Sequence, residues 1–103
     1  MSKNSGTFRL ETHNHELSAE LCARRTGAAL QRWAVSMRYA ARRIGDMIGA
    51  DRRAVENYLY GQHCPPMHKL IELMAECDEL CAEVNQMVAE RREARKGKTD
   101  VRV

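Results

Sequence analysis

Ala40 to Gly61 is the stretch that most restricts how this chain can fold, because two helical patterns meet there at one glycine. The apolar residues of the two patterns recur every three or four positions: Ala41, Ile44 and Ile48, and then Val55, Tyr58 and Leu59. Gly49 lies between them, where a helix commonly ends in the left-handed conformation that glycine adopts without steric cost. Asp51 then has the residue type of a helix N-cap. The stretch therefore predicts two short helices joined by a tight turn at residues 48–50.

The small and apolar residues around this turn carry a family resemblance. Gly45 lies four residues before Gly49, and Val55 and Tyr58 follow as an apolar pair. This pattern resembles the helix-turn-helix of the Cro/CI-type (XRE-like) DNA-binding regulators of phages and bacteria. In that family a small residue lets the two helices approach closely; alanine is the commoner choice, and glycine costs the helix about 1 kcal/mol. The resemblance covers about residues 27–77. It implies an all-α fold, a small helical bundle with a lambda-repressor/Cro-like helix-turn-helix and a long C-terminal helix.

The resemblance also implies which residues would contact double-stranded DNA. In the family, base edges are read from the first turn of the second helix and from one turn later. The matching positions here are Asp51, Arg52, Arg53 and Asn57. Arginine and asparagine can each pair with a base through two hydrogen bonds. For Asp51 the alternative role is to cap the helix without contacting a base. Glu56 is expected to orient an arginine rather than to contact DNA. The candidates for the phosphate backbone are Arg38, Tyr39, Arg42, Arg43 and Tyr60.

Charge is distributed unevenly along the chain, although its net value is only +3. Residues 28–64 hold six arginines and three acidic residues, whereas residues 67–90 hold one lysine and six acidic residues. From residue 91 onward six basic residues stand against two acidic ones. A phosphate backbone would attract the first block and repel the second, so the acidic segment is expected to face away from nucleic acid.

A first helical region is predicted from Ser18 to Met37, either as one helix or as two pieces hinged at Thr26–Gly27. Its apolar stripe comprises Leu30, Trp33, Ala34 and Met37, with Trp33 expected as the central packing residue. Arg24 and Arg25 flank the stripe as further candidates for phosphate contact.

A last helix is predicted from Met67 to about Arg95, after Pro65 and Pro66 end the preceding segment. Its first part, through Cys77, is expected to close the core over the motif. Its second part has apolar side chains in excess of what a domain of this size can cover, and these predict a homodimer interface: Leu80, Cys81, Val84, Met87 and Val88. The alternative is a helix that folds back on the Ser18–Arg25 segment.

The chain therefore divides into four parts: a flexible N-terminal arm (1–16), a helix-turn-helix domain (17–77), a dimerisation helix (78–91) and a basic disordered tail (92–103). The sequence has no stretch that could span a membrane and no signal-peptide core, so a cytoplasmic protein is expected, associated with the nucleoid when bound.

Four cysteines form no CxxC pair, which suits reduced thiols. A zinc site would have to combine His63, Cys64 and His68 with Cys77 or Cys81. Because the last two lie on an apolar helical stripe, where cysteine behaves as a small hydrophobic residue, no metal and no cofactor are expected.

The resemblance implies a dimeric repressor or autoregulator of a phage, mobile element or bacterial operon, acting on an inverted repeat in double-stranded DNA. The alternative function is a protein-interaction module, such as an antitoxin or an anti-activator, that binds a partner through its C-terminal helix. No catalytic residues are assigned, because the chain has no phosphate-binding loop and no nucleophile with an obvious base, and no small-molecule substrate is evident.

Overall fold

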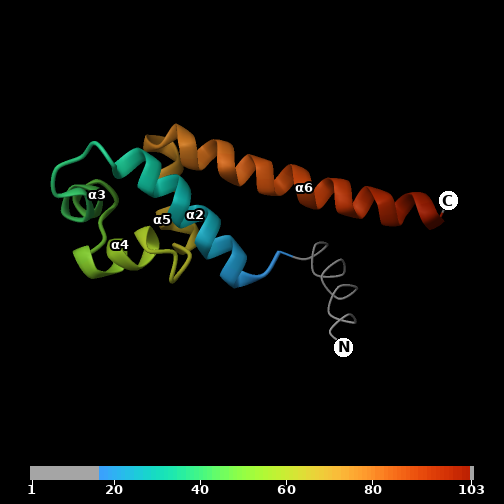
Figure 1. Ribbon diagram of the computed structural model, residues 1–103, viewed down its shortest axis with the longest axis horizontal. Helices are drawn as coiled ribbons and strands as arrows, with labels where there is room; N and C mark the ends of the chain where they lie inside the picture. Colours follow the sequence, from blue (N-terminus) through green and yellow to red (C-terminus); the bar gives the residue numbers. More distant parts are fainter. Residues whose placement is uncertain (1–16, 103) are drawn as a thin grey trace, which may run out of the picture.

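The computed structural model describes residues 17–102, with the side chains of residues 17–96, and this part of the chain is entirely α-helical. The helices are α2 (Ala19–Ala34), α3 (Ala40–Ile48), α4 (Arg52–Leu59), α5 (Met67–Glu76) and α6 (Asp78–Arg102). They form a small bundle in which α3 and α4 lie at one end and α6 extends away from the other (Figure 1). The expected all-α fold is confirmed. The arm expected at residues 1–16 lies outside the described residues.

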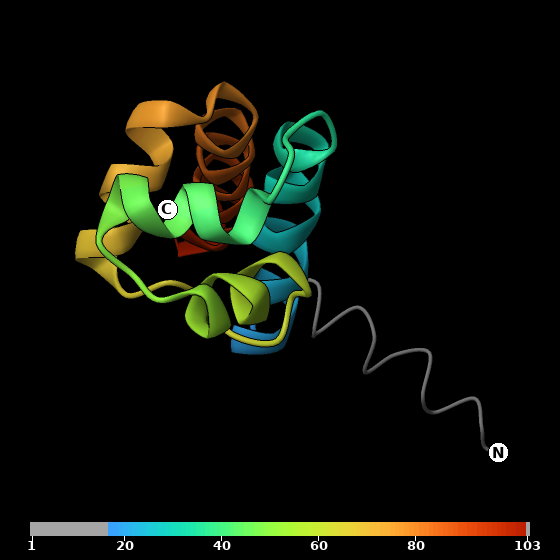
Figure 2. The same ribbon diagram turned by 90° about the vertical axis from the view of Figure 1, so that its left-hand side faces the viewer.

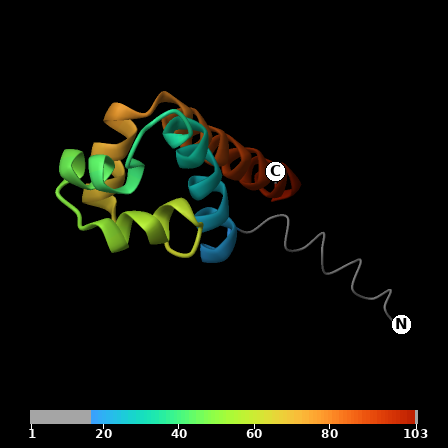
Figure 3. The same cartoon turned by 60° about the vertical axis from the view of Figure 1, so that its left-hand side comes forward.

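The turn between α3 and α4 follows the local rules that the sequence predicts. Gly49 ends α3 with φ +73°, and the N–H groups of Gly49 and Ala50 both donate to the Gly45 carbonyl, at 2.8 and 2.9 Å. Asp51 begins α4 as its N-cap, with Oδ1 accepting the Ala54 N–H at 2.8 Å. The turn lies at the edge of the molecule, with α3 and α4 on either side of it (Figure 3).

Helix α2 is continuous, so the alternative of two pieces hinged at Thr26–Gly27 is wrong. Gly27 serves a close contact instead. A Cβ atom at Gly27 would lie 2.8 Å from the Tyr58 carbonyl oxygen and 2.9 Å from the Cα of Gly61, which itself has φ +73°. The absence of a side chain at both glycines therefore allows α2 to lie directly on the turn that ends α4.

The predicted helix from Met67 to Arg95 is interrupted at Cys77, which is fully buried and has an extended conformation (φ −122°, ψ 105°). Its N–H closes α5 on the Leu73 carbonyl, and its Sγ accepts the Leu80 N–H at 3.3 Å, as an N-cap side chain does. Asp78 and Glu79 follow in the first turn of α6, where negative charge is favourable. Cys77 is thus a helix junction.

Helix α6 folds back along α2 and runs in the opposite direction (Figure 1). This is the alternative stated in the sequence analysis, a last helix that folds back on the first helical region. Leu80 is 0% exposed and Met87 is 4% exposed, so these two side chains are covered within one copy of the chain. The expectation that they lie beyond the domain is therefore wrong for both. Cys81 and Val84 are half-buried, and Val88 remains 42% exposed. The helix also continues to Arg102, where a disordered tail was expected from residue 92.

The core takes side chains from all five helices, among them Leu30 of α2, Ile44 of α3 and Leu73 of α5. Leu30 is 1% exposed, whereas Trp33 is only half-buried and packs against this cluster. The expectation that Trp33 is the central packing residue is therefore wrong, and Leu30, one turn earlier, is the more deeply buried. Within residues 17–102, none of the helices combines the length and hydropathy needed to cross a bilayer.

Candidate nucleic-acid interface

The first turn of α4 presents two arginine side chains to solvent. Arg52 is 73% exposed, with its Nε 3.6 Å from a carboxylate oxygen of Glu56 one turn later, so the expected pairing of Glu56 with an arginine is confirmed. Arg53 is exposed and makes no ion pair with any of the described side chains. Both lie away from the buried Val55 and Tyr58.

The other two residues expected to read bases lie differently. Asp51 is exposed, and one of its carboxylate oxygens is engaged in capping α4, which leaves the second oxygen for another partner. Asn57 is half-buried, and its backbone carbonyl accepts the Gln62 N–H at 2.9 Å, which ties the loop after α4 to the helix. Of the four, Arg52 and Arg53 therefore have the greatest reach.

The segment before α3 has an unusual backbone. Tyr39 precedes the helix with φ 56° and ψ 48°, a left-handed conformation that is rare for a bulky side chain and costs of order 1–2 kcal/mol. Its ring is exposed, with the Arg38 guanidinium carbon 5.9 Å from the ring centroid. The protein backbone thus holds Arg38 and Tyr39 together on the surface at the start of α3, where contacts to the phosphate backbone of DNA are expected.

Three further expected phosphate contacts are also exposed. Arg42 and Arg43 lie in the first turns of α3 and make no ion pair within residues 17–96, and Tyr60, which follows α4, is 69% exposed. Figure 2 shows α3 and α4 side by side on one face of the molecule. The arginines of both helices therefore leave a positive charge that no described carboxylate neutralises, except at Arg52.

Two side chains that sequence reasoning missed hold this pair of helices in place. The Lys69 ammonium of α5 donates to the carbonyls of Ile48 and Gly49, at 3.0 and 2.6 Å, and so caps the end of α3. Gln31 of α2 donates to the Leu59 carbonyl at the end of α4. Lys69 and Gln31 each contact residues that are twenty or more positions away in the sequence, so no local sequence pattern predicts these contacts. A Cβ at Gly45 would overlap the Ala50 carbonyl oxygen, which explains the glycine at that position.

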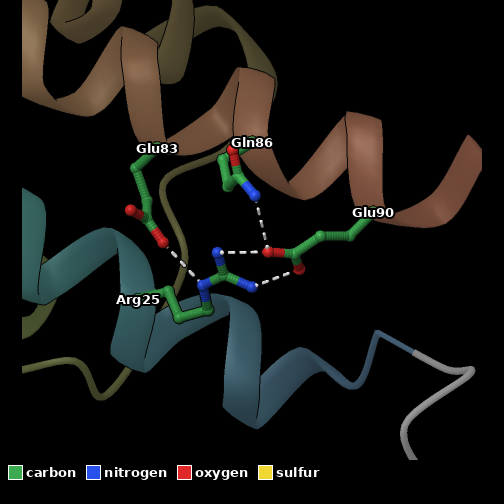
Figure 4. A network of polar contacts seen from close by, with 4 residues as sticks. All are labelled: Arg25, Glu83, Gln86 and Glu90. Atoms are coloured by element: carbon green, nitrogen blue, oxygen red, sulfur yellow. Dashed lines mark hydrogen bonds and ion pairs between the residues drawn. The ribbon is translucent and has the colours of Figure 1, made fainter. Parts of the chain in front are cut away.

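Arg25 does not belong to this surface, although it was a candidate for phosphate contact (Figure 4). Its Nε lies 2.5 Å from Glu83, and its two terminal nitrogens donate to both oxygens of Glu90, at 2.7 and 3.1 Å. The hydrogen bond to Glu90 is the largest cause of the raised pKa of Arg25, and the same bond lowers the pKa of Glu90. Arg25 is therefore engaged in holding α6 to α2, and two of the acidic residues of α6 are neutralised there.

The cysteines and histidines do not converge on a metal site within the described residues, which hold no cluster of three or more ligand side chains. All four cysteines are free thiols. Burial raises the pKa of Cys64 to about 11, with a further contribution from a hydrogen bond to Cys22, and burial also raises the pKa of Cys77. These two thiols therefore stay protonated near neutral pH, a state that suits neither a nucleophile nor a metal ligand.

Comparisons with models of protein families, with curated proteins and with solved structures find no match to this chain. The resemblance to Cro/CI-type regulators therefore stays a prediction from the residues around Gly49.

Proposed function

We propose that this chain is a sequence-specific double-stranded DNA-binding regulator of transcription that inserts α4 into the major groove. The observation that carries the proposal is the exposed arginine pair, Arg52 and Arg53, on the first turn of a helix that is fixed from both ends. Helix α4 has eight residues, and an α-helix with its side chains is about 10–12 Å across, close to the width of the major groove of B-DNA. Its Asp51 cap and the Gln31 bond to its last carbonyl hold that first turn in a fixed orientation.

The charges around α4 support the same proposal. Arg42 and Arg43 on α3 and Arg38 before it are exposed, so the pair of helices would meet two phosphate strands with several cations. Glu83 and Glu90, which would repel phosphate, point to Arg25 instead. The strained backbone at Tyr39 is the kind of cost that a fold tolerates where a side chain must be held for binding.

Regulation by repression or autoregulation in a bacterium, phage or mobile element is the biological role that this mode of binding suits, since occupancy of a promoter needs no catalysis. Selection of one site calls for two copies on half-sites about 34 Å apart. A homodimer is therefore part of the proposal. Its surface excludes Leu80 and Met87, which are buried in each copy, and Val88 is the most exposed of the five side chains first expected there.

The test begins with selection of duplexes from a random pool and titration of the enriched sequence by mobility shift. Arg52→Ala and Arg53→Ala should each weaken binding to that sequence by about 1–3 kcal/mol. Arg38→Ala should weaken all duplexes alike and lower the salt dependence by about one ion. The matched control is Arg32→Ala, an exposed arginine at the end of α2 with no place in the proposed site.

Two results would contradict the proposal. The first is failure to enrich any sequence. The second is equal titration curves for the wild-type chain and the Arg52→Ala/Arg53→Ala variant, with both proteins fully helical. Either result would favour the alternative function, a protein-interaction module. The burial of Leu80 and Met87 nevertheless removes much of the apolar surface through which such a module was expected to bind its partner.

A further inference from the structure

Between α2, α6 and the loop before α5 lies a cavity of about 350 Å³ that is partly open to solvent. This size falls within the range of small-molecule sites in proteins, about 300–1,000 Å³. It is separate from the surface of α3 and α4, because its walls come from α2, α5, α6 and the adjoining segments. Most of its lining is apolar: Leu17, Cys22, Leu70, Val84, Met87 and Val88.

One end of the cavity is positively charged. Along α6 the lining passes from Val84 and Val88 to Arg91 and Arg92, and seven residues of helix span roughly 10 Å. Arg91 and Arg92 make no ion pair among the described side chains. Arg25 of α2, in contrast, pairs with Glu83 and Glu90 of α6. Arg95 also lines the cavity, and arginine side chains beside an apolar lining suit an anion on an apolar body.

The other end of the cavity holds a polar group without a partner. Thr26 is 2% exposed and lines the cavity, and within residues 17–96 its hydroxyl makes no hydrogen bond. It follows Arg25, whose guanidinium reaches both Glu83 and Glu90, so Thr26 lies against the part of α6 that carries Val84 and Met87. Its burial places it deeper than the half-buried Arg91 and the exposed Arg92. Because a buried hydroxyl without a partner costs about 1–3 kcal/mol, it favours a ligand atom that bonds to it.

We propose that this cavity binds an elongated organic acid, with its carboxylate at Arg91 and Arg92 and a hydroxyl or carbonyl oxygen at Thr26. The apolar body of the ligand lies along Val84, Met87 and Val88. Burial raises the pKa of the Cys64 thiol in this wall to about 11, so this thiol presents no charge to the body of the ligand. Binding of the acid needs no DNA and is measured on the protein alone.

The test is calorimetric titration of 10-hydroxydecanoate into the full 103-residue chain. Saturable binding of one molecule per chain is expected. Decanoate should bind about threefold to tenfold more weakly because it leaves Thr26 unpaired, and decylamine at least about tenfold more weakly because its charge is repelled. The Arg91→Gln/Arg92→Gln variant should lose about tenfold or more, whereas Arg32→Gln/Arg42→Gln, with the same change of charge elsewhere, should bind as the wild type does.

A second variant separates the Thr26 end from the carboxylate end. Thr26→Val keeps the shape of the side chain and should bind the hydroxy acid and decanoate equally. The proposal is overturned if the chain does not saturate, if decylamine binds as well as the acids, or if the arginine variant matches its control. Equal affinity of the wild-type chain for decanoate and its hydroxy derivative would also overturn it. Circular dichroism on each variant separates a loss of binding from a loss of fold.

Discussion

Replacing Leu80 by alanine tests the most consequential feature of the fold, the return of α6 onto α2. The Leu80 side chain is fully buried, and core leucine-to-alanine changes cost about 3–5 kcal/mol when the surroundings cannot collapse into the cavity. A chain with 86 described residues has a total stability on the order of 5–10 kcal/mol. The variant should therefore lose about half of its stability and melt roughly 12–40 °C lower.

The assay is urea and thermal unfolding followed by circular dichroism, at protein concentrations that differ about a hundredfold. If α6 is covered by its own α2, the loss caused by Leu80→Ala is the same at both concentrations. If a second copy covered α6, the unfolding midpoint would rise with concentration and the variant would lose most of that rise. The matched control is Val88→Ala on the exposed side of the same helix, which should cost no more than about 0.5–1 kcal/mol.

Two outcomes would refute the reasoning. A Leu80→Ala variant with near wild-type stability would mean that the side chain is not in the core. A loss that appears only at the higher concentration would move Leu80 to an interface between copies, as the sequence alone had suggested.

Three further results are expected. Gly45→Ala should destabilise by about 1 kcal/mol in urea unfolding, because overlap with the Ala50 carbonyl outweighs the helix propensity that alanine gains; a more stable variant would contradict the close approach of α3 and α4. Arg25 lowers the pKa of Glu90, so this pair contributes stability that is present above the usual glutamate pKa and is lost as the pH falls through the lowered pKa. Glu90→Gln should therefore flatten the decline in unfolding free energy between about pH 5 and pH 3. An unchanged pH profile would mean that the two side chains are not paired in solution. Cys64, with its pKa raised to about 11 by burial, should have a thiolate fraction about a hundredfold below that of an ordinary cysteine at pH 8, so iodoacetamide should label it much faster in urea than in buffer, as mass spectrometry would show.

The parts of the fold that the sequence predicts correctly are those that neighbouring residues determine. The turn at Gly49 and the cap at Asp51 depend on contacts within five residues, so their residue types suffice to place them. The exposed position of Arg53 follows in turn, because it lies on the side of the helix opposite Val55 and Tyr58. Arg52 lies beside that buried face, and its exposure follows from its place at the first position of the helix.

The parts that it misses depend on distant residues. Gly27 in a helical pattern is equally consistent with a hinge and with a close contact, and only the position of Gly61 decides between them. Cys77 continues the apolar stripe of the last helix, so its role as a junction emerges only once Leu73 and Leu80 are both in the core. Arg25 has the same residue type as the arginines of α3 and α4, and its engagement rests on Glu90, which is 65 residues away.

The distance between Arg25 and Glu90 also bears on how the protein is made. A ribosome adds residues in order at about 5–20 per second, so α2, α3 and α4 are complete before any of α6 exists. During that interval the face of α2 that α6 will cover stays open to water, and the core lacks Leu80. A product released early, just after α5, would contain every arginine of α3 and α4, and Gln31 and Lys69 to brace those helices, on an unfinished core. The packing on which α2, and through it α3 and α4, depend is thus completed only when α6 has been synthesised.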